Sequence, residues 1–321
     1  MIRILAIDGP TIDGVSWWRN VRPLTELQRN YPDIQVTFAG EGVSVQQLLQ
    51  TDILIMFRPV TEKSLRFIEH CKSPIFNIKV IIDLDDNLWR LPPGHPSEAD
   101  YNANAAHLRK IYALADGIWC STDPLTYFAD ARAGRGRVVP NAILERDLPN
   151  APSPYKGFVC WRGSVTQIAD IQNEDAVELF EANHDKFARW FFWGYHPGTY
   201  RTEKTKALPR VDVIQYMAGL KEVGMNVMWK PLQENEFNNA KSNIAFLEAT
   251  IAGAICVTNY ATKPGWEMAV DKFTDNPDFI ASQWAASRAW ILEHYDLGKV
   301  NSIRYHHILQ ILGIEGQSIR A

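Results

Sequence analysis

Residues 238–260, "NNAKSNIAFLEATIAGAICVTNY", join a polar head to an apolar tail, which predicts a helix followed by a buried strand. We expect the opening asparagines to cap a helix that begins near Ala240, with Lys241 and Ser242 beside its first backbone N–H groups. Such a helix start is suited to a phosphate group. Glu248, about two turns further on, could accept hydrogen bonds from ribose hydroxyls. The alternative is an ordinary amphipathic helix whose lysine and glutamate are solvated.

Two neighbouring apolar segments end in residues that bind anions. The run "FVCW" is followed by Arg162, Gly163 and Ser164, and the run "NVMW" is followed by Lys230. The carboxyl ends of parallel strands lie at one edge of a sheet, so these residues converge on the side where a diphosphate would need them.

The segment "VIIDLDDNLWR" supplies three carboxylates after a strand, Asp83, Asp85 and Asp86. A strand followed by D-x-D resembles the start of a haloacid-dehalogenase-type phosphatase, in which Asp83 would attack phosphorus and Asp85 would act as the acid. Against this interpretation, Asn87 replaces the usual threonine or valine, and no later strand ends in paired carboxylates. Otherwise these aspartates cap a loop or line a ligand site.

Aromatic and basic residues meet near the N-terminus. Trp17 and Trp18 precede Arg19 and Arg22 in what the sequence predicts to be a loop. Such a mixture could stack a sugar or a base and hold a phosphate. The preceding "AIDGPTIDG" lacks the G-x-G-x-x-G spacing, which argues against a dinucleotide oxidoreductase.

Short apolar segments separated by helical stretches organise the whole chain. They cover 3–7, 35–40, 52–57, 79–84, 117–121 and 137–141, then 157–163, 188–194, 226–232 and 254–259, and a helical tail follows from about 283. Continuous apolar strands alternating with helices predict parallel sheets covered on both faces. The proline-rich stretch 144–157 between the two sets predicts a linker. Two doubly wound α/β domains therefore fit better than one sheet, with ligands beyond the carboxyl ends of the strands.

Composition limits the classes of function. The 321 residues carry a net charge of -4, with 46% hydrophobic and 22% charged residues, as in a globular protein. Nucleic-acid binding would need a local patch, such as Arg132, Arg135 and Arg137, although a solvated turn is the default interpretation there. The four cysteines stand singly in apolar segments, which predicts buried free thiols and no metal site. Without a signal peptide or a membrane-length apolar run, we expect a cytoplasmic chain with no membrane insertion.

The segment "PLQENEFNNAKSNIAFLEATIAGAICVTNY" resembles the sugar-nucleotide-binding segment of retaining GT-B glycosyltransferases, which often reads P-L-x(4)-F-N-x-x-K-S-x-x-K-x-x-E. Other motifs of that family follow the same order along the chain: "DGVSWWRNVRPLTEL", "DLDDNLW", "LADGIWCSTDPL" with "VVPNAI", and "WRGSVTQIADI". The resemblance covers roughly residues 13–260. Two positions depart from it, since Gln167 stands where histidine is usual and Ala245 where a second lysine is usual.

The resemblance implies a role for each matching residue. Glu248 would bind the donor ribose, Lys241 and Ser242 its diphosphate, and Arg162 would add a second cation. The implied donor-binding residues are Arg162, Gly163, Ser164, Lys230, Leu232, Ser242, Asn243 and Glu248. The implied catalytic residues are Arg19, Lys241 and Asp85, and the acceptor side carries Trp17, Trp18, Asp83 and Asp86.

The resemblance also implies an architecture and a reaction. We expect a GT-B fold of two doubly wound Rossmann-like domains facing a central cleft: an acceptor-side domain at 1–145, a linker at 146–156, and a nucleotide-sugar-binding domain at 157–321 that ends in a helical segment. The implied reaction is glycosyl transfer with retention from a nucleotide-sugar, expected to be a UDP-sugar, without a metal or bound cofactor.

The acceptor follows from the resemblance less directly. The family includes phage-encoded enzymes that place sugars on hydroxymethylated pyrimidines of DNA, and together with the Trp-Trp-Arg segment this makes duplex DNA one expected partner. Polysaccharide or small-molecule acceptors remain alternatives, as does a non-catalytic module that binds a sugar-nucleotide.

Overall fold

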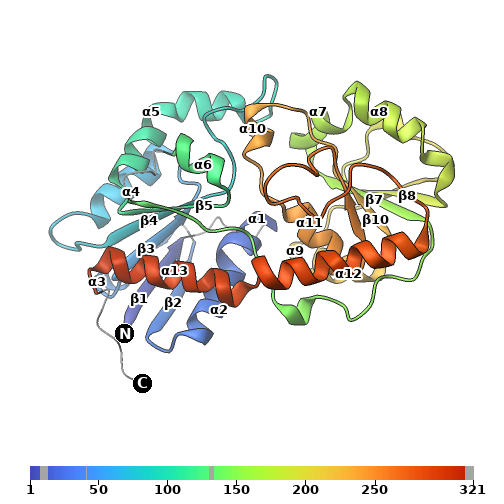
Figure 1. The fold of residues 1–321 in the computed structure, drawn as a ribbon. Coiled ribbons are helices and arrows are strands. Elements are labelled where there is room, and N and C mark those ends of the chain that lie inside the picture. The colour runs from blue at the N-terminus through green and yellow to red at the C-terminus, as the bar shows by residue number, and fades with distance from the viewer. Residues whose placement is uncertain (8–13, 41, 130–133, 315–321) are drawn as a thin grey trace. The chain divides into compact units, whose positions relative to one another are not determined.

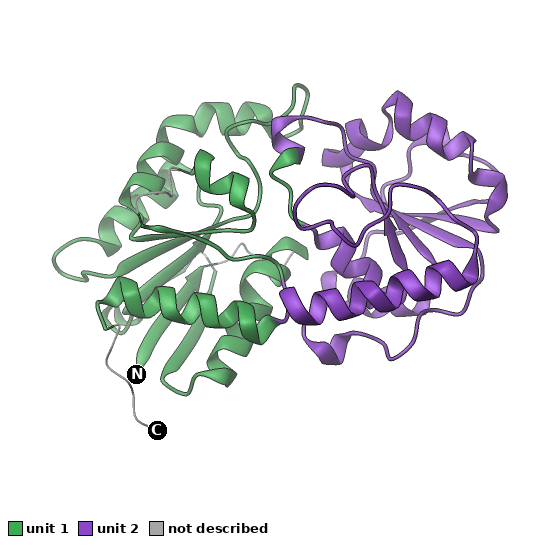
Figure 2. Cartoon of the chain, viewed as in Figure 1, with its two compact units in different colours: residues 1–141, 239–242, 297–321 green, residues 142–238, 243–296 purple. Residues whose placement is uncertain are grey.

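The computed structural model describes residues 1–7, 14–40, 42–129 and 134–314. These residues form two compact α/β units (Figures 1 and 2). Unit 1 comprises Met1–Asn141, Asn239–Ser242 and Leu297–Ala321, and unit 2 comprises Ala142–Asn238 and Asn243–Asp296. The chain therefore returns to unit 1 twice, once for a tetrapeptide that contains Lys241 and once for its last helix.

Unit 1 is built on a parallel sheet whose order, among the described residues, is β2-β1-β3-β4-β5-β6. Its strands are β1 (Ile2–Ile7), β2 (Ile34–Ala39), β3 (Ile53–Phe57), β4 (Lys79–Leu84), β5 (Gly117–Cys120) and β6 (Gly136–Val138). Every strand pairing in this sheet is parallel. The strand order reverses direction between β1 and β3, so the sheet is doubly wound.

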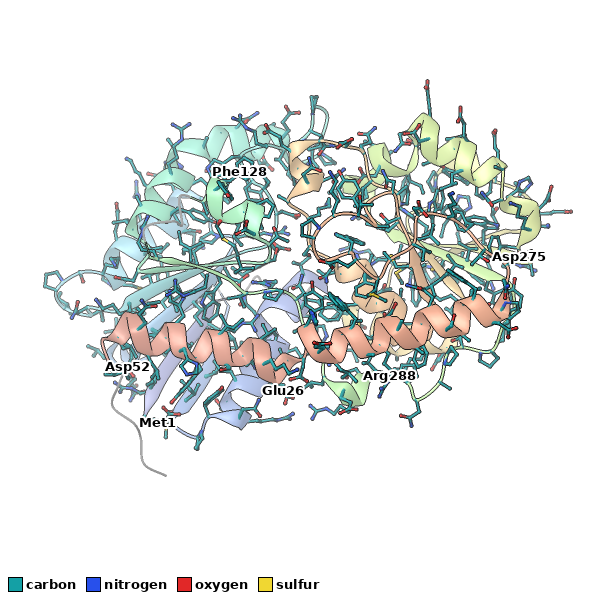
Figure 3. The ribbon with its side chains drawn as sticks, in the orientation of Figure 1. Met1, Glu26, Asp52, Phe128, Asp275 and Arg288 are labelled. Atoms are coloured by element: carbon teal, nitrogen blue, oxygen red, sulfur yellow. The ribbon has the colours of Figure 1, made fainter. Side chains whose placement is uncertain are left out.

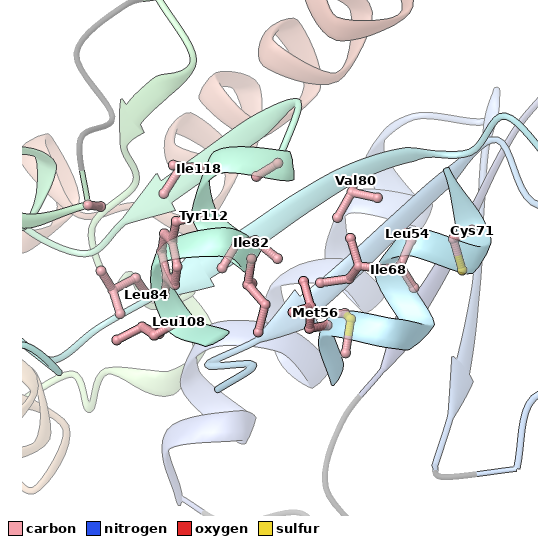
Figure 4. Close-up of a cluster of buried hydrophobic side chains, with 14 of the residues drawn as sticks. Leu54, Met56, Ile68, Cys71, Val80, Ile82, Leu84, Leu108, Tyr112 and Ile118 are labelled. Atoms are coloured by element: carbon pink, nitrogen blue, oxygen red, sulfur yellow. The ribbon is translucent and has the colours of Figure 1, made fainter. Parts of the chain in front are cut away.

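Helices cover both faces of this sheet: α4, α5 and α6 on one face, and α2 and α13 on the other (Figure 1). The helices of unit 1 are α1 (Gly14–Ser16), a π turn (Trp17–Val21), α2 (Arg22–Asn30), α3 (Val45–Leu49), α4 (Glu62–Cys71), α5 (Glu98–Leu114), α6 (Asp123–Phe128) and α13 (Leu297–Leu312). Aliphatic side chains such as Leu54, Val80, Ile82 and Leu108 fill the space between β3, β4 and the helices α4 and α5 (Figure 4). Burial on both faces explains why these strands are continuous apolar runs.

Unit 2 contains a second parallel sheet, whose order among the described residues is β11-β10-β7-β8-β9. Its strands are β7 (Phe158–Gly163), β8 (Arg189–Gly194), β9 (Thr205–Leu208), β10 (Val227–Trp229) and β11 (Ile255–Val257). The first strand, β7, lies at the centre, β8 and β9 extend to one side, and β10 and β11 extend to the other. This is the Rossmann order, and its topological switch point lies between β7 and β10.

An aromatic core supports the second sheet. Trp161, Trp190 and Trp229 are almost fully buried beside Phe192 and Tyr200. The helices of this part of the chain are α7 (Ile168–Ile171), α8 (Glu174–Glu181), α9 (Val213–Glu222), α10 (Glu236–Asn239), α11 (Ile244–Ile251) and α12 (Pro277–His294). Single 3-10 turns occupy Glu145–Asp147, Val165–Gln167, His184–Lys186 and Gly198–Tyr200.

The predicted strands coincide with observed ones to within three residues at each end. Strand β9 was not predicted. Its sequence, "TKAL", is short and partly polar because it pairs only with β8 at the edge of the sheet, where one side is exposed.

Two segments differ from the predicted domain division. The stretch predicted as a linker is bound along unit 2: the Asn226 side chain accepts from the Lys156 N–H at 2.8 Å, and Arg288 donates to the Pro149 carbonyl at 3.3 Å. Figure 3 labels Arg288 on α12. Helix α13 belongs to unit 1, where Asn301 donates to the Pro23 carbonyl at 2.9 Å. Its buried side chains contact both α2 and β5, where His307 Nδ1 accepts from the Trp119 indole at 3.1 Å, and nothing in the local sequence of α13 indicates these partners.

The four cysteines are free and buried, as predicted. Burial raises the pKa of Cys120, Cys160 and Cys256 to about 12, so these thiols stay protonated and inert. Within the described ranges, none of the helices has both the length and the apolar character that crossing a bilayer requires.

Candidate functional site

The switch point of the unit 2 sheet carries two cationic residues. Arg162 is the fifth residue of β7, and Lys230 directly follows β10, the strand paired with β7. The carboxyl ends of the two strands therefore bring an arginine and a lysine to the same edge, as predicted from the sequence. Ligands of doubly wound sheets bind outside this edge, where the strand order reverses.

Arg162 forms a bidentate ion pair with Glu248 of α11. Its Nη2 donates to Glu248 Oε1 at 2.6 Å, and its Nε donates to Oε2 at 2.8 Å. The Tyr216 hydroxyl, from α9, lies 3.0 Å from the same Oε2 and 3.2 Å from Arg162 Nε. The Glu248 side chain is 1% exposed, whereas that of Arg162 is 32% exposed. The carboxylate is thus enclosed and the guanidinium reaches the surface.

Burial and charge act in opposite directions on these groups. Burial alone would lower the pKa of Arg162, but Glu248 and Tyr216 raise it above its ordinary value. Burial and the Glu248 charge raise the pKa of Tyr216 well above its ordinary value. The arginine therefore stays charged and the tyrosine stays protonated over the range in which enzymes work.

The helix that carries Glu248 begins later than predicted. Helix α11 starts at Ile244 with Asn243 as its N-cap residue, so the expectation of a helix from Ala240 capped by the opening asparagines is wrong. The Asn243 side chain makes no capping bond and donates instead to the Gly265 carbonyl at 3.0 Å. Lys241 and Ser242 precede the helix and belong to unit 1. The alternative of a solvated Glu248 is also wrong, because the helix lies in the core.

Glycines let the backbones approach closely at the end of β7. A Cβ on Gly163 would lie 2.3 Å from the Trp161 ring and 2.6 Å from Gln167 Oε1, and a Cβ on Gly194 would lie 2.7 Å from the Gly163 carbonyl oxygen. Ser164 is exposed and accepts from the Thr166 N–H at 3.3 Å, which closes a tight turn. A tight turn with small residues leaves main-chain groups open to a ligand.

The loop after Lys230 is fixed by side chains from elsewhere in unit 2. The Asn259 side chain binds both backbone groups of Leu232: its Oδ1 accepts from the Leu232 N–H at 3.0 Å, and its Nδ2 donates to the Leu232 carbonyl at 2.6 Å. Asp170 accepts from the Gln233 N–H at 3.0 Å and from the Asn238 side chain at 2.6 Å. The loop predicted to contact the donor is therefore held in one conformation by polar bonds.

In unit 1, Arg19 is fully buried in the π turn. Its Nε and Nη2 bind the two oxygens of Asp83 at 2.8 and 2.9 Å, and its Nη1 donates to the Val139 carbonyl at 2.6 Å. Both side chains of the pair are 0% exposed. Arg19 thus lies in a helical turn and not in the predicted loop, and it ties that turn to β4 and to the end of β6.

The neighbouring tryptophans are also helical. Trp18 is 2% exposed and packs in the core, with the Arg22 guanidinium 5.8 Å from its ring. Trp17 is half-buried in the same π turn. The expectation of a Trp-Trp-Arg loop is wrong, because these residues form a π turn in which Trp18 and Arg19 are buried.

A second charged cluster lies beyond the carboxyl ends of β3 and β4. Arg58, which follows β3, binds Asp85 through Nε and Asp86 through Nη2, the latter at 2.6 Å. Lys241 Nζ lies 3.8 Å from Asp86 Oδ1. Burial raises the pKa of Asp85 to about 6 although Arg58 opposes it, whereas Arg58 and Lys241 overcome burial and lower the pKa of Asp86.

The phosphatase interpretation of this segment is not supported. Asp83, its nucleophile, is fully enclosed and both its oxygens bind Arg19. Over the described ranges, no three His, Cys, Asp or Glu side chains gather in a metal-binding arrangement. The basic patch considered for nucleic-acid binding comprises Arg132, Arg135 and Arg137. Arg135 donates to carbonyls at the end of α5, and Arg137 donates to the Gln310 side chain at 2.5 Å. Arg132 lies outside the described residues.

Three residues that bond to the predicted site residues were not themselves predicted: Arg58, Asn141 and Tyr216. For Arg58 the sequence gives a weak signal, since this arginine directly follows an apolar strand. Asn141 accepts from Arg19 Nη1 at 3.3 Å, and it lies in the "VVPNAI" motif. Tyr216 lies in the helix "VIQYMAGLKE", which has no feature that distinguishes it from a packing residue.

Comparison with known proteins identifies the fold. No family model matches the chain, and no curated protein matches it in sequence. Among solved structures, the glycosyltransferase AviGT4 of avilamycin A biosynthesis matches with a TM-score of 0.59 at 10% identity, over 98% of this chain and 99% of that one. A candidate UDP-N-acetylglucosamine 2-epimerase from Listeria monocytogenes matches with a TM-score of 0.56 at 10% identity, over 97% and 96%.

A third structure is the TarM G117R mutant of S. aureus, determined with fondaparinux, alpha-GlcNAc-glycerol and UDP. It matches with a TM-score of 0.56 at 10% identity and covers 90% of this chain. The present chain spans 58% of the length of that protein. The fold is GT-B. Together with the two parallel α/β units, these structural matches confirm the fold class predicted from the sequence.

Proposed function

We propose that this chain transfers a glycosyl group from a nucleotide-sugar donor, a UDP-sugar, with retention of configuration at the anomeric carbon. The observation that carries the proposal is the Arg162–Glu248 pair at the switch point of the unit 2 sheet. A GT-B fold with a cation at this place is suited to hold the diphosphate of a donor. The UDP in the TarM structure supports the choice of nucleotide.

The chemical demand of the reaction explains the choice of residues. When the glycosidic bond breaks, negative charge grows on the departing diphosphate, and fixed cations and dipoles stabilise it best. Arg162 presents a charged, partly exposed guanidinium, and the small residues Gly163 and Ser164 follow it directly at the end of β7. Lys230, which follows the neighbouring strand, adds charge at the same edge. Unit 2 is thus the proposed donor-binding unit.

Unit 1 contributes residues whose roles stay predictions. Asp85 and Lys241 are proposed to act in the catalytic step, and both belong to the cluster around Arg58. We assign Arg19 a positioning role, since its guanidinium is enclosed and acts on Asp83 and on the residues after β6. The reaction is proposed to need no metal and no bound cofactor.

The proposed acceptor is a hydroxymethylated pyrimidine in duplex DNA. This rests on the sequence resemblance to enzymes that modify DNA. With Trp18 and Arg19 enclosed, Trp17 is the aromatic residue of that turn left to contact an acceptor. A polysaccharide or a small molecule is the alternative acceptor, and the acceptor panel described below separates them.

A donor assay tests the proposal. The protein is incubated with UDP-, GDP- and ADP-sugars, and release of the nucleoside diphosphate is measured with and without acceptors. We expect release from a UDP-sugar and a loss of about hundredfold in Arg162→Ala, because a charged hydrogen-bond donor to the leaving group is removed. Arg189→Ala, an exposed arginine on β8 of the same sheet, is the matched control and should keep its activity.

The epimerase among the structural matches defines the competing outcome. A protein that binds a UDP-sugar and converts it to an isomer, without passing the sugar to water or to any acceptor, is an epimerase. A protein that binds the donor with no turnover is a binding module. Either result would overturn the proposed transfer.

A further inference from the structure

Arg162 uses only part of its hydrogen-bonding capacity inside the protein. Its Nε and Nη2 are engaged by Glu248, and no described residue bonds Nη1. A bidentate carboxylate fixes the plane of a guanidinium, so the direction of the remaining N–H groups is set by Glu248. Since about a third of the Arg162 side chain is exposed, those groups are available to a ligand.

Glu248 is enclosed and hydrogen-bonded within unit 2. Its Oε1 accepts from Arg162, its Oε2 accepts from Arg162 and Tyr216, and 1% of the side chain is exposed. With 1% of the side chain exposed, a ligand hydroxyl could reach this carboxylate only if the residues that enclose it moved. Opening a bidentate arginine–carboxylate pair to admit a ligand is unfavourable.

Tyr216 supports the same guanidinium from a third direction. Its ring centroid lies 5.5 Å from the Arg162 guanidinium carbon, and its hydroxyl is bonded to both members of the pair. Trp193 packs edge-on against the Tyr216 ring with centroids 4.8 Å apart. Helix α9 can approach Trp193 because it has glycine at position 219, where a Cβ would lie 2.6 Å from that ring. Tyr216 therefore has little freedom to leave Arg162.

We infer that Glu248 and Tyr216 are positioning residues that hold Arg162 for the diphosphate, and that Glu248 does not bind the donor ribose. The inference rests on the proposed function, since it takes Arg162 as the diphosphate ligand. It replaces the ribose role implied by the sequence resemblance, and it gives Tyr216 a role in the reaction.

Nucleotide binding in a double-mutant cycle tests the inference. Dissociation constants are measured by calorimetry for whichever of UDP, GDP and ADP binds the wild type, and for the 2′-deoxy form of that nucleotide. We expect Arg162→Ala to weaken binding about hundredfold, Glu248→Gln about thirtyfold and Tyr216→Phe about tenfold. In the Arg162→Ala background the other two substitutions should change binding less than twofold.

The deoxynucleotide separates positioning from ribose contact. If Glu248 acts through Arg162, Glu248→Gln leaves the ratio between the dissociation constants of the ribo and 2′-deoxy nucleotides unchanged. If Glu248 bound the ribose, that ratio would fall toward one and the effects of Glu248→Gln and Arg162→Ala would add. Either of those two results would overturn the inference while leaving the proposed function intact.

A matched control accounts for loss of a buried hydroxyl. Tyr200→Phe removes a hydroxyl that donates to the Ile171 carbonyl within the same core, and it should leave nucleotide binding unchanged. Equal losses in Tyr200→Phe and Tyr216→Phe would show a general effect on the fold and contradict the inference. If no nucleoside diphosphate binds the wild type, the proposed function fails and the inference with it.

Discussion

At position 248 the sequence places a carboxylate among apolar residues, and the structure pairs it with Arg162 and Tyr216 instead of solvent. Both charged residues were predicted as donor ligands from strand ends and motif. Their pairing could not be predicted, because 86 residues separate them and no local rule links a β7 end to a helix face. Tyr216 was missed for the same reason.

A substitution at Gly163 tests the close packing between the end of β7 and the side chains of Trp161 and Gln167. Gly163→Ala should lower the free energy of unfolding by about 1–3 kcal/mol, since its Cβ would overlap the Trp161 ring and Gln167 Oε1. Denaturant unfolding measures the change. Gly198→Ala is the control, because a Cβ there meets no atom within 4 Å. Equal stabilities of the two variants would contradict the packing described.

Asp85 gives a pH-dependent stability. Burial raises its pKa to about 6 in the folded chain against an ordinary value of 3.8, so the folded state holds the proton more tightly, and this contribution to stability is lost as pH rises from about 4 to about 6. Asp85→Asn stays neutral throughout. We expect the wild type to lose about 3 kcal/mol relative to Asp85→Asn over that window, by denaturant unfolding. A constant difference between the two proteins would refute the raised pKa.

At the scale of elements, apolar runs predicted the parallel strands well because burial on both faces leaves a strong signal. Helix starts were predicted less well. The segment 240–242 looks helical in sequence but is not helical, because the Ala240 carbonyl accepts from the Thr122 hydroxyl at 2.8 Å and Lys241 pairs with Asp86. The segment around Trp17 looks like a loop but forms a π turn. Tertiary contacts decided both cases.

Helix α13 is fastened to unit 1 by buried polar groups. Arg304 is fully enclosed, its Nη1 donates to Asn301 Oδ1 at 2.9 Å, and its Nε has no partner among the described residues. Burial lowers the pKa of Arg304 to about 9, which shows how costly this charge is. Asn301→Ala should therefore destabilise the chain by about 3 kcal/mol, because the arginine loses its bonded acceptor.

Ile303 supplies the comparison for that variant. It lies on the same helix and is 38% exposed, so Ile303→Ala should change the unfolding free energy by about 0.5 kcal/mol or less. If both variants unfold at the same denaturant concentration, the Asn301–Arg304 bond does not hold α13.

At the scale of the whole molecule, the alternation of strands and helices was sufficient to predict two doubly wound units and, with the motifs, the GT-B fold. The membership of α13 and of residues 239–242 in unit 1 could not be read from order along the chain. Both depend on contacts between segments that lie far apart in the sequence, such as Thr122 with Ala240 and Pro23 with Asn301.

Chelation tests the predicted independence from metals. Transfer should persist after treatment with EDTA, since in the proposed reaction Arg162 and Lys230 supply the positive charge that a metal would otherwise provide at the diphosphate. Activity with and without EDTA is compared at equal ionic strength. Complete loss that magnesium restores would show that the charge comes from a metal.

The most direct test of the proposed function is mass spectrometry of the acceptor. The protein is incubated with UDP-, GDP- and ADP-sugars and with duplex DNA containing hydroxymethylcytosine, unmodified DNA, oligosaccharides and small alcohols. We predict a gain of one sugar mass on the digested hydroxymethylated nucleoside alone. A gain on another acceptor would keep glycosyl transfer and replace DNA as the acceptor. If the donor is consumed only to an isomer, or not at all, and no acceptor gains mass, the protein is not a glycosyltransferase.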